Sequence, residues 1–166
     1  VLASADMSGV RVGAGINSLD QRNVKIVSIL SYAATYAASL YGPFREAVGS
    51  KKNLKSDKKT DQMDLRNSNE AFREISLDIK EGADMVMVNP GLPYLDIIKS
   101  IKDNFKIPVF AYQVSGEYSL IKNGIKNKWI NDEAILESLI AFKRAGASAI
   151  VTYFALDIER KIRNFN

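Results

Sequence analysis

The sequence predicts an α/β fold in which buried parallel strands alternate with amphipathic helices. Four short apolar runs, rich in β-branched residues, lie at 26–32, 85–88, 109–114 and 149–154, and residues 1–5 have the composition of the end of a fifth run. Strands of a parallel sheet are covered on both faces, so they are continuously apolar rather than alternating. Segments with apolar residues at helical spacing separate these runs, which is typical of repeated strand–helix units.

Three of the intervening helices have start and stop signals. Asn67 is a candidate N-cap because Glu70 follows it three residues later, as in a capping box. The start and stop residues are, in chain order, Asn67 and Gly82, Asp96 and Pro108, and Asn131 and Gly146. The residues expected to face the core are Phe72, Ile75 and Ile79 in the first helix, Ile97, Ile98, Ile101 and Phe105 in the second, and Ile135, Leu136, Leu139, Ile140 and Phe142 in the third.

Residues 80–84 (KEGAD) and 143–148 (KRAGAS) both place a Gly-Ala turn between a helix and a buried strand. Such repeated units predict either a doubly wound sheet or a (β/α)8 barrel. A complete barrel needs about 250 residues, so five strands would form about half of one. A half-barrel has two open sheet edges and an uncovered apolar interior, and both favour association. We therefore expect a protein partner, or self-association, to complete it.

The composition excludes several kinds of active site. The 166 residues contain neither cysteine nor histidine. Disulfides, thiolate nucleophiles, Cys/His zinc sites and Ser-His-Asp or Cys-His machineries are therefore ruled out. Any chemistry must use Lys, Arg, Asp, Glu, Tyr, Ser or a cofactor. No segment approaches the roughly 20 apolar residues of a membrane-spanning helix, so no membrane span is expected.

The net charge of +4 is concentrated in one lysine-rich segment, with five lysines between positions 51 and 59. A solvated loop, a nucleic-acid-binding arm and a loop that folds over an anionic ligand are three interpretations. The nucleic-acid interpretation is the weakest, because no aromatic residue lies among the lysines to stack on bases. Val1 is not an initiator methionine and no targeting signal is evident. We expect part of a longer protein or a processed product, in the cytoplasm or in an organelle.

In a barrel of this kind, functional groups lie at the carboxyl ends of the strands and in the loops that follow. The corresponding segments are 33–36, 89–94, 115–118 and 152–154, which are polar but weakly reactive. Each candidate also has a structural interpretation. Asn89 and Ser115 are also typical turn residues. Tyr153 could be an aromatic residue of the core, Arg45 a surface cation, and Glu74 a solvent-facing residue of a helix.

Several longer motifs together resemble one family, the porphobilinogen synthases, also called 5-aminolevulinate dehydratases. They are residues 31–37 (SYAATYA), 41–47 (YGPFREA), 57–64 (DKKTDQMD), 81–98 (EGADMVMVNPGLPYLDII), 111–118 (AYQVSGEY) and 136–138 through 152–155 (LES to TYFA). The resemblance runs through nearly the whole chain in order. It implies a partial (β/α)8 TIM barrel, with roughly strands four to eight as a single domain over 1–166 and a lid-like, Lys-rich loop at 46–64.

The family condenses two 5-aminolevulinate molecules into porphobilinogen in tetrapyrrole (heme) biosynthesis, and it assembles into oligomers. By resemblance, the two lysines that form Schiff bases with the substrates correspond to Thr35 and Asn89. Neither side chain can form an imine. The resemblance therefore implies a degenerate, non-catalytic member that acts as a structural or regulatory subunit. Two alternatives are a working subunit completed by another chain and a binder of a 5-aminolevulinate-like carboxylate.

The resemblance also implies the residues that hold substrate. Arg45, Lys58 and Gln62 match the groups that bind the carboxylate of one substrate, and Ser115 and Tyr153 match those that bind the other. Arg and Lys suit this role because they form charge-assisted hydrogen bonds with carboxylates.

Only one metal position follows from the resemblance. Glu74 matches an allosteric Mg²⁺ position, and a lone carboxylate holds Mg²⁺ mostly through water. No other cofactor is implied.

Overall fold

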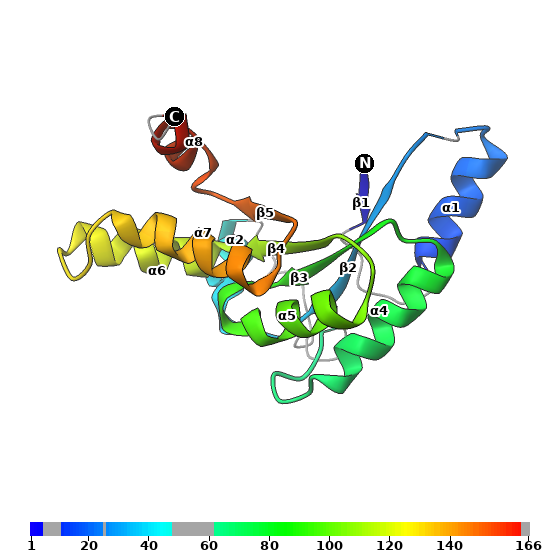
Figure 1. Cartoon of the computed structure of the whole chain (residues 1–166), viewed down its shortest axis with the longest axis horizontal. Coiled ribbons are helices and arrows are strands. Elements are labelled where there is room, and N and C mark those ends of the chain that lie inside the picture. Colours follow the sequence, from blue (N-terminus) through cyan, green and yellow to red (C-terminus); the bar gives the residue numbers. More distant parts are fainter. Residues whose placement is uncertain (5–10, 25, 48–61, 164–166) are drawn as a thin grey trace.

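The computed structural model describes residues 1–4, 11–24, 26–47 and 62–163. Five parallel strands form one curved sheet whose spatial order, β1-β2-β3-β4-β5, is also their order along the chain (Figure 1). A doubly wound sheet reverses the direction of strand addition at a switch point, and this sheet does not. The fold is therefore the partial α/β barrel that the sequence predicts.

The strands are short and most are followed by a helix. The strands are β1 (Leu2–Ser4), β2 (Ile29–Thr35), β3 (Met85–Asn89), β4 (Val109–Gln113) and β5 (Ala149–Thr152). The helices are α1 (Arg11–Gln21), α2 (Gly42–Ala47), α4 (Asn69–Glu81), α5 (Leu95–Asn104), α6 (Ser115–Lys126), α7 (Glu133–Ala145) and α8 (Ala155–Arg163), with short 3-10 turns η1 (Ser39–Tyr41) and η3 (Leu92–Tyr94).

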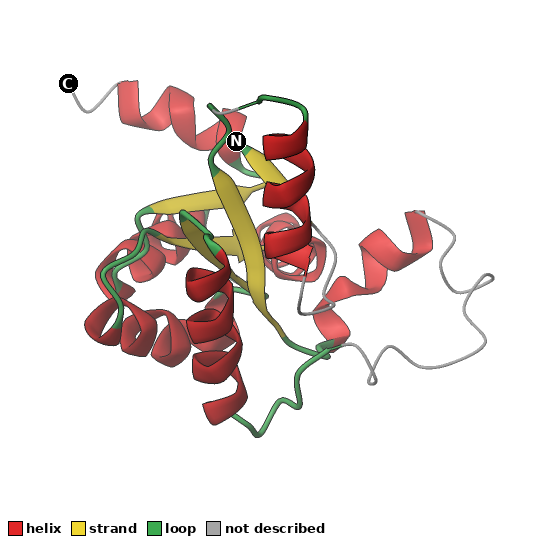
Figure 2. Ribbon diagram, turned by 90° about the vertical axis from the view of Figure 1, so that its right-hand side faces the viewer, coloured by secondary structure: helices red, strands yellow, loops and turns green. Residues whose placement is uncertain are grey.

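Helices α4, α5 and α7 lie on the outer, convex side of the sheet (Figures 1 and 2). The core between the sheet and these helices includes Val88, Val109, Ile98 and Phe142, none of which is exposed to solvent. Burying a side chain of this size contributes about 1.5–3 kcal/mol. This apolar layer fixes the positions of the strands, and therefore of the residues at their carboxyl ends.

Side chains alternate between the two faces of each strand. On β4, Ala111 and Gln113 are fully buried beneath the helices, whereas Tyr112 is only partly buried on the inner face. Thr35 and Asn89 are paired in register at the ends of β2 and β3. Parallel pairing places both side chains on the same face.

The expected stop signals at Gly82 and Gly146 are confirmed, whereas each expected start differs by one residue. The N-caps of α4 and α7 are Ser68 and Asp132, and α5 begins at Leu95. The Asn67 side-chain oxygen accepts hydrogen bonds from the backbone N–H groups of Asn69 and Glu70 at 3.1 and 3.3 Å. Gly82 and Gly146 end α4 and α7 with φ of 105° and 104°. Glycine adopts this left-handed conformation without the steric penalty of a Cβ.

Two expectations about the second strand and the third helix were wrong. The strand runs from Ile29 to Thr35, and Ile26 is 97% exposed. Pairing with β1 begins only at Ile29, opposite Leu2, so the earlier apolar residues have no neighbour to pair with. Ile140 was expected to face the core but is 48% exposed. It follows Leu139 by about 100° around the helix, because an α-helix has 3.6 residues per turn.

Two differences concern the end of the chain. The last strand ends at Thr152 rather than at residue 154, because the Thr152 hydroxyl accepts the Phe154 N–H at 3.0 Å and turns the chain into α8. Helix α8 leads away from β5 and lies apart from the outer layer (Figure 1). It contacts the rest of the molecule through Ile158, which belongs to the main core cluster.

Candidate functional site

A cavity of about 240 Å³ lies at the carboxyl ends of β2, β3 and β4. This is the edge of the sheet where a parallel α/β barrel places functional groups. The described residues that line it are Tyr32, Thr35, Tyr41, Phe44, Arg45, Gln62, Asn89, Tyr112, Val114, Ser115 and Tyr153. Six of the eight residues predicted from the sequence are therefore brought together in one cavity.

Thr35 and Asn89 form one side of the cavity and are bonded to each other. The Thr35 hydroxyl donates a hydrogen bond to Asn89 Oδ1 at 2.9 Å. The two residues are only 6% and 5% exposed. Because buried polar groups are costly when unpaired, this bond stabilises the side-chain positions that the two residues adopt.

Tyr41 continues this hydrogen-bonded chain. Asn89 Nδ2 donates to the Tyr41 phenolic oxygen at 2.9 Å. Burial raises the pKa of Tyr41 well above its usual value, so the group remains a neutral phenol. The chain Thr35–Asn89–Tyr41 thus presents uncharged hydrogen-bonding groups, and none of them is a nucleophilic amine.

Arg45 is the positively charged side chain among the described residues that line the cavity. Its guanidinium donates to Gln62 Oε1 at 3.1 Å and lies 5.3 Å from the centre of the Tyr41 ring. A guanidinium is planar and permanently charged, and its donors match the geometry of a carboxylate. This arrangement is chemically suited to a carboxylate.

Ser115 and Tyr153 lie on other walls of the same cavity. Ser115, the first residue of α6, is buried, and its hydroxyl oxygen accepts the Phe44 N–H at 3.1 Å. The hydroxyl hydrogen of Ser115 remains able to donate to a ligand. Tyr153 is more exposed, and its hydroxyl lies 3.4 Å from that of Tyr112.

Two predicted positions are not among the described lining residues. Lys58 lies outside the residues that the structure describes, as do residues 48–61 of the expected lid-like loop. Glu74 lies on α4, where it is partly buried rather than fully solvent-facing, and forms an ion pair with Arg73 at 3.0 Å. Within the described ranges, no three Asp or Glu side chains form a cluster suited to a metal ion. The role of Glu74 in binding Mg²⁺ remains a prediction.

Three tyrosines of the cavity were not among the predicted site residues. Tyr32 and Tyr112 lie on the inner faces of β2 and β4, and Tyr41 ends η1. The alternation of side chains along a strand is the signal that indicates Tyr112, because Ala111 and Gln113 on either side of it face the helices. Tyr41 has no such signal, since it reaches Asn89 from the 3-10 turn η1 and not from a strand.

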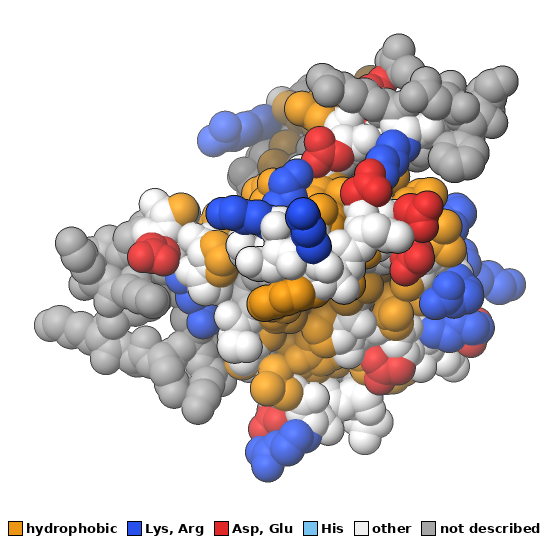
Figure 3. Space-filling view, turned by 90° about the vertical axis from the view of Figure 1, so that its left-hand side faces the viewer, with side chains coloured by type: hydrophobic (Ala, Val, Ile, Leu, Met, Phe, Trp, Pro, Cys, Tyr) orange, Lys and Arg blue, Asp and Glu red, His pale blue; other side chains and the backbone are white. Residues whose placement is uncertain are grey.

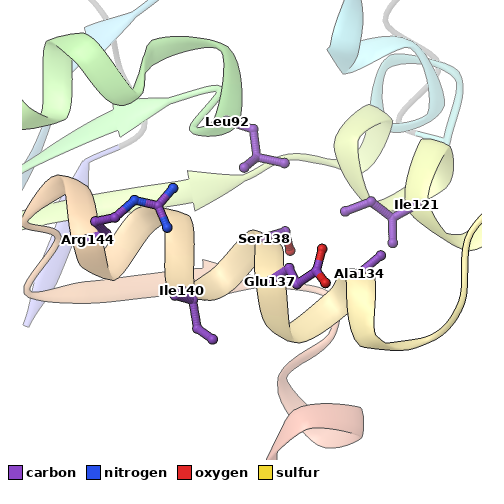
Figure 4. A pocket seen from close by; sticks show the side chains of 7 residues that line it. All are labelled: Leu92, Ile121, Ala134, Glu137, Ser138, Ile140 and Arg144. Atoms are coloured by element: carbon purple, nitrogen blue, oxygen red, sulfur yellow. The ribbon is translucent and has the colours of Figure 1, made fainter.

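A second hollow, of about 590 Å³, lies on the outside of the molecule between α6, α7 and η3. Leu92, Ile121 and Ile140 contribute apolar walls, and Glu137 and Arg144 contribute charge (Figure 4). It shares no described lining residue with the cavity at the strand ends. The two hollows are therefore separate.

The face at the projecting ends of α6 and α7 exposes hydrophobic side chains. Figure 3 shows them in the middle of this face, with lysine and arginine side chains beside them. Leu120 on α6, and Trp129 and Ile130 just beyond it, are exposed apolar residues of this end.

The family model described as delta-aminolevulinic acid dehydratase matches residues 1–161. The chain belongs to the delta-aminolevulinic acid dehydratase family. This family is the one that the motifs resemble, so the recognition from the sequence is confirmed.

Members of the dehydratase family from distant organisms are similar to this chain. It is 53% identical to the delta-aminolevulinic acid dehydratase of Bradyrhizobium diazoefficiens over 164 residues, which cover 98% of this chain and 46% of that protein. It is 51% identical to the chloroplastic enzyme of Pisum sativum over 163 residues, or 98% of this chain and 41% of that protein. The chain spans about half the length of the curated relatives that it matches.

A solved structure of the dehydratase family also matches the fold. It is the crystal structure of delta-aminolevulinic acid dehydratase (porphobilinogen synthase) from Toxoplasma gondii ME49, in complex with the reaction product porphobilinogen. The TM-score is 0.89 at 48% sequence identity, and the match covers 92% of this chain and 44% of that chain.

Among the described residues, no helix is both long and apolar enough to cross a lipid bilayer.

Proposed function

We propose that this chain is a non-catalytic member of the porphobilinogen synthase family, with a structural or regulatory role. The observation that carries the proposal is the hydrogen-bonded chain Thr35–Asn89–Tyr41 at the strand ends. By the resemblance of the surrounding motifs, Thr35 and Asn89 occupy the positions of the two lysines that form Schiff bases. No lysine is among the described residues that line the cavity.

The chemical argument is that an imine requires a primary amine. A lysine in a desolvated pocket supplies it, because burial lowers the pKa of the ammonium and exposes a nucleophilic lone pair. A threonine hydroxyl and an asparagine carboxamide have no equivalent reaction with a ketone. Loss of covalent catalysis at both positions is expected to lower the rate by many orders of magnitude, since every 1.36 kcal/mol in the barrier is tenfold in rate.

The structural argument is that Thr35 and Asn89 have hydrogen-bond partners within the cavity wall. The Thr35 hydroxyl, both polar atoms of the Asn89 amide and the Tyr41 hydroxyl are joined in one chain. Among the described residues, no buried side-chain nitrogen or oxygen is without a hydrogen-bond partner. Because these side chains have hydrogen-bond partners, they support a stable pocket that does not need a reactive amine.

The rest of the cavity supports retained ligand binding. Arg45 and Gln62 lie at one wall and Ser115 and Tyr153 at others. These residue types match the family's carboxylate-binding groups, and a guanidinium is a strong carboxylate donor. We include in the proposal that the pocket binds a 5-aminolevulinate-like carboxylate reversibly, without a covalent bond.

A role in assembly is supported by the shape of the sheet. Within the described residues, β1 and β5 each pair with only one neighbouring strand. Unpaired strand edges favour association with further strands. We therefore propose that the chain associates with family-type subunits, and that its contribution is contact and ligand binding rather than turnover.

The test is borohydride trapping with 5-aminolevulinic acid on the full-length protein. Borohydride reduces an imine to a stable amine, so an enzyme that forms a Schiff base gains mass. We expect no mass increase and no pyrrole product, whereas the Bradyrhizobium diazoefficiens enzyme, as positive control, should gain mass. A reduced adduct on any residue of this chain, or measurable porphobilinogen formation, would reject the proposal.

A further inference from the structure

A buried carboxylate, Glu117, lies behind the cavity and does not line it. It is the third residue of α6 and is only 3% exposed. Its two oxygens accept three backbone N–H groups, from Leu92 at 2.7 Å, from Gly91 at 3.3 Å and from Val114 at 2.6 Å. Backbone N–H groups are thus the partners of this negative charge.

The three donors belong to two different strand ends. Gly91 and Leu92 follow β3, two and three residues after Asn89, whereas Val114 follows β4 and precedes Ser115. A single side chain therefore joins the turn after β3 to the turn after β4. Because Asn89 and Ser115 both line the cavity, the bonds of Glu117 define the separation between two of its walls.

The two residues before Glu117 hold a third segment against the same helix turn. The Ser115 hydroxyl oxygen accepts the Phe44 N–H at 3.1 Å. A Cβ at Gly116 would lie 2.2 Å from the Leu40 carbonyl oxygen, so only glycine admits the backbone at this point. Both contacts attach the η1–α2 segment, which carries Tyr41 and Arg45.

A local capping role explains only part of this geometry. The bond from Val114 N–H to Glu117 is the reciprocal bond of a capping box and serves α6 itself. The bonds from Gly91 and Leu92 span 26 and 25 residues of sequence and satisfy no group of α6. Their effect is to hold the turn after β3, not to stabilise the helix.

Burial raises the pKa of Glu117 above the ordinary value of a glutamate, and the three N–H bonds oppose that rise. Replacing the carboxylate would leave buried backbone donors without acceptors, which is unfavourable. The bonds to the backbone therefore offset the cost of burying the Glu117 carboxylate.

We propose that Glu117 is a positioning residue that holds the turn after β3, and with it Asn89, in place relative to Ser115 and the β4 end of the cavity. The inference concerns the pocket of the proposed function, but it does not depend on whether that pocket turns over substrate or on which ligand it takes. Its test therefore uses backbone exchange rather than activity.

The experiment is hydrogen–deuterium exchange of the full-length protein, read by mass spectrometry. Glu117→Gln keeps the size of the side chain but replaces one acceptor oxygen with a donor NH₂ group. We expect peptides that cover residues 89–94 to exchange at least tenfold faster, since Leu92 and Gly91 bond to different oxygens of the carboxylate and at least one of them then faces a donor NH₂ group in place of its acceptor. Glu133→Gln, at an exposed glutamate in the first turn of α7, is the matched control and should leave this exchange unchanged.

A second control separates positioning from general loss of stability. Ile75→Ala removes a fully buried side chain on α4, so it should lower the melting temperature without selectively accelerating residues 89–94. Exchange in Glu117→Gln that stays at the wild-type rate in this segment, or that rises evenly as in Ile75→Ala, would overturn the inference. If Glu117→Gln does not fold, Glu117→Asp provides the same readout, because it keeps the charge but shortens the reach to Gly91 and Leu92.

Discussion

The side chains at positions 35 and 89 decide what chemistry this cavity can perform. They face each other across two neighbouring strands and are joined by a bond of 2.9 Å. A residue that is placed at the end of a core strand keeps its position even when its chemistry changes, because the strand is held by the apolar layer. The positions of Thr35 and Asn89 at the cavity are therefore set by the fold rather than by their own chemistry.

We predict that Asn89→Lys allows imine formation without giving turnover. The new amine would enter a buried site beside Arg45 and Tyr41, where desolvation and a nearby positive charge lower the pKa of a lysine. The measurement is the mass increase after treatment with 5-aminolevulinic acid and borohydride. Asn104→Lys, at an exposed position on α5, is the control. Absence of trapping in Asn89→Lys and also in the double variant Thr35→Lys/Asn89→Lys would mean that the pocket does not place a ketone at these strand ends.

We predict that Asp78→Asn stabilises the protein at neutral pH. Asp78 is buried on α4, where it accepts the Ser31 hydroxyl at 2.6 Å, and burial raises its pKa above the usual value. A raised pKa means that the folded protein favours the protonated acid, so the wild type loses stability as the pH rises through the folded-state pKa. The asparagine variant should be more stable in urea at pH 7, and this advantage should shrink as the pH falls toward 4. Asp20→Asn, at an exposed site on α1, should give no such trend. An advantage that persists at low pH would contradict the titration argument.

At the scale of the elements, the sequence predicts most strands and three helices because their apolar patterns follow directly from burial. The start of β2 is different, since pairing with β1 begins at Ile29 opposite Leu2 and the apolar residues at 26–27 lie before it. Helix α6 was also not predicted. Its apolar residues Tyr118, Ile121 and Ile125 stand at helical spacing and pack partly buried against the main core. Its close contacts through Gly116 with Leu40 and through Gly124 with Ile130 have no apolar side chain in the sequence to indicate them.

We predict that Gly91→Ala destabilises the turn after β3. A Cβ at this position would lie 2.3 Å from Cε1 of Phe142, which is fully buried on α7. The same Cβ would lie 3.2 Å from the Tyr112 carbonyl oxygen, so overpacking should lower the free energy of unfolding by about 1–3 kcal/mol. The measurement is urea unfolding. Gly15→Ala is the matched control: its Cβ meets nothing within 4 Å in α1, and a gain of about 0.5–1 kcal/mol is expected there. Equal effects of the two substitutions would show that contact with Phe142 does not matter.

At the scale of the whole molecule, the cavity assembles from segments far apart in the sequence. Its tyrosines come from β2, η1, β4 and the residue directly after β5. The resemblance of motifs predicts Arg45, Gln62, Ser115 and Tyr153 because it preserves their sequence context. It does not predict the bond between Thr35 and Asn89, because that bond arises only when parallel pairing brings the two residues into register.

The attachment of α8 to the rest of the molecule gives a last prediction. Two exposed ion pairs connect it to α6 and to the start of α7, Lys122 with Asp157 at 3.4 Å and Lys161 with Asp132 at 2.7 Å. Its apolar anchor is Ile158, which is buried in the main core cluster. Solvent screens exposed pairs strongly, so the apolar contact should dominate. We expect Ile158→Ala to cost about 2–5 kcal/mol.

Hydrogen exchange of residues 155–163, measured at low and high salt, tests this difference. Ile158→Ala should accelerate exchange throughout α8 at both salt concentrations, because the buried contact does not depend on ionic screening. Asp132→Asn, which removes the partner of Lys161, should leave exchange close to the wild-type rate. Detachment of α8 in Asp132→Asn, or by high salt alone, would instead show that charge pairing holds the helix. In that case α8 would be expected to separate from the barrel as ionic strength rises.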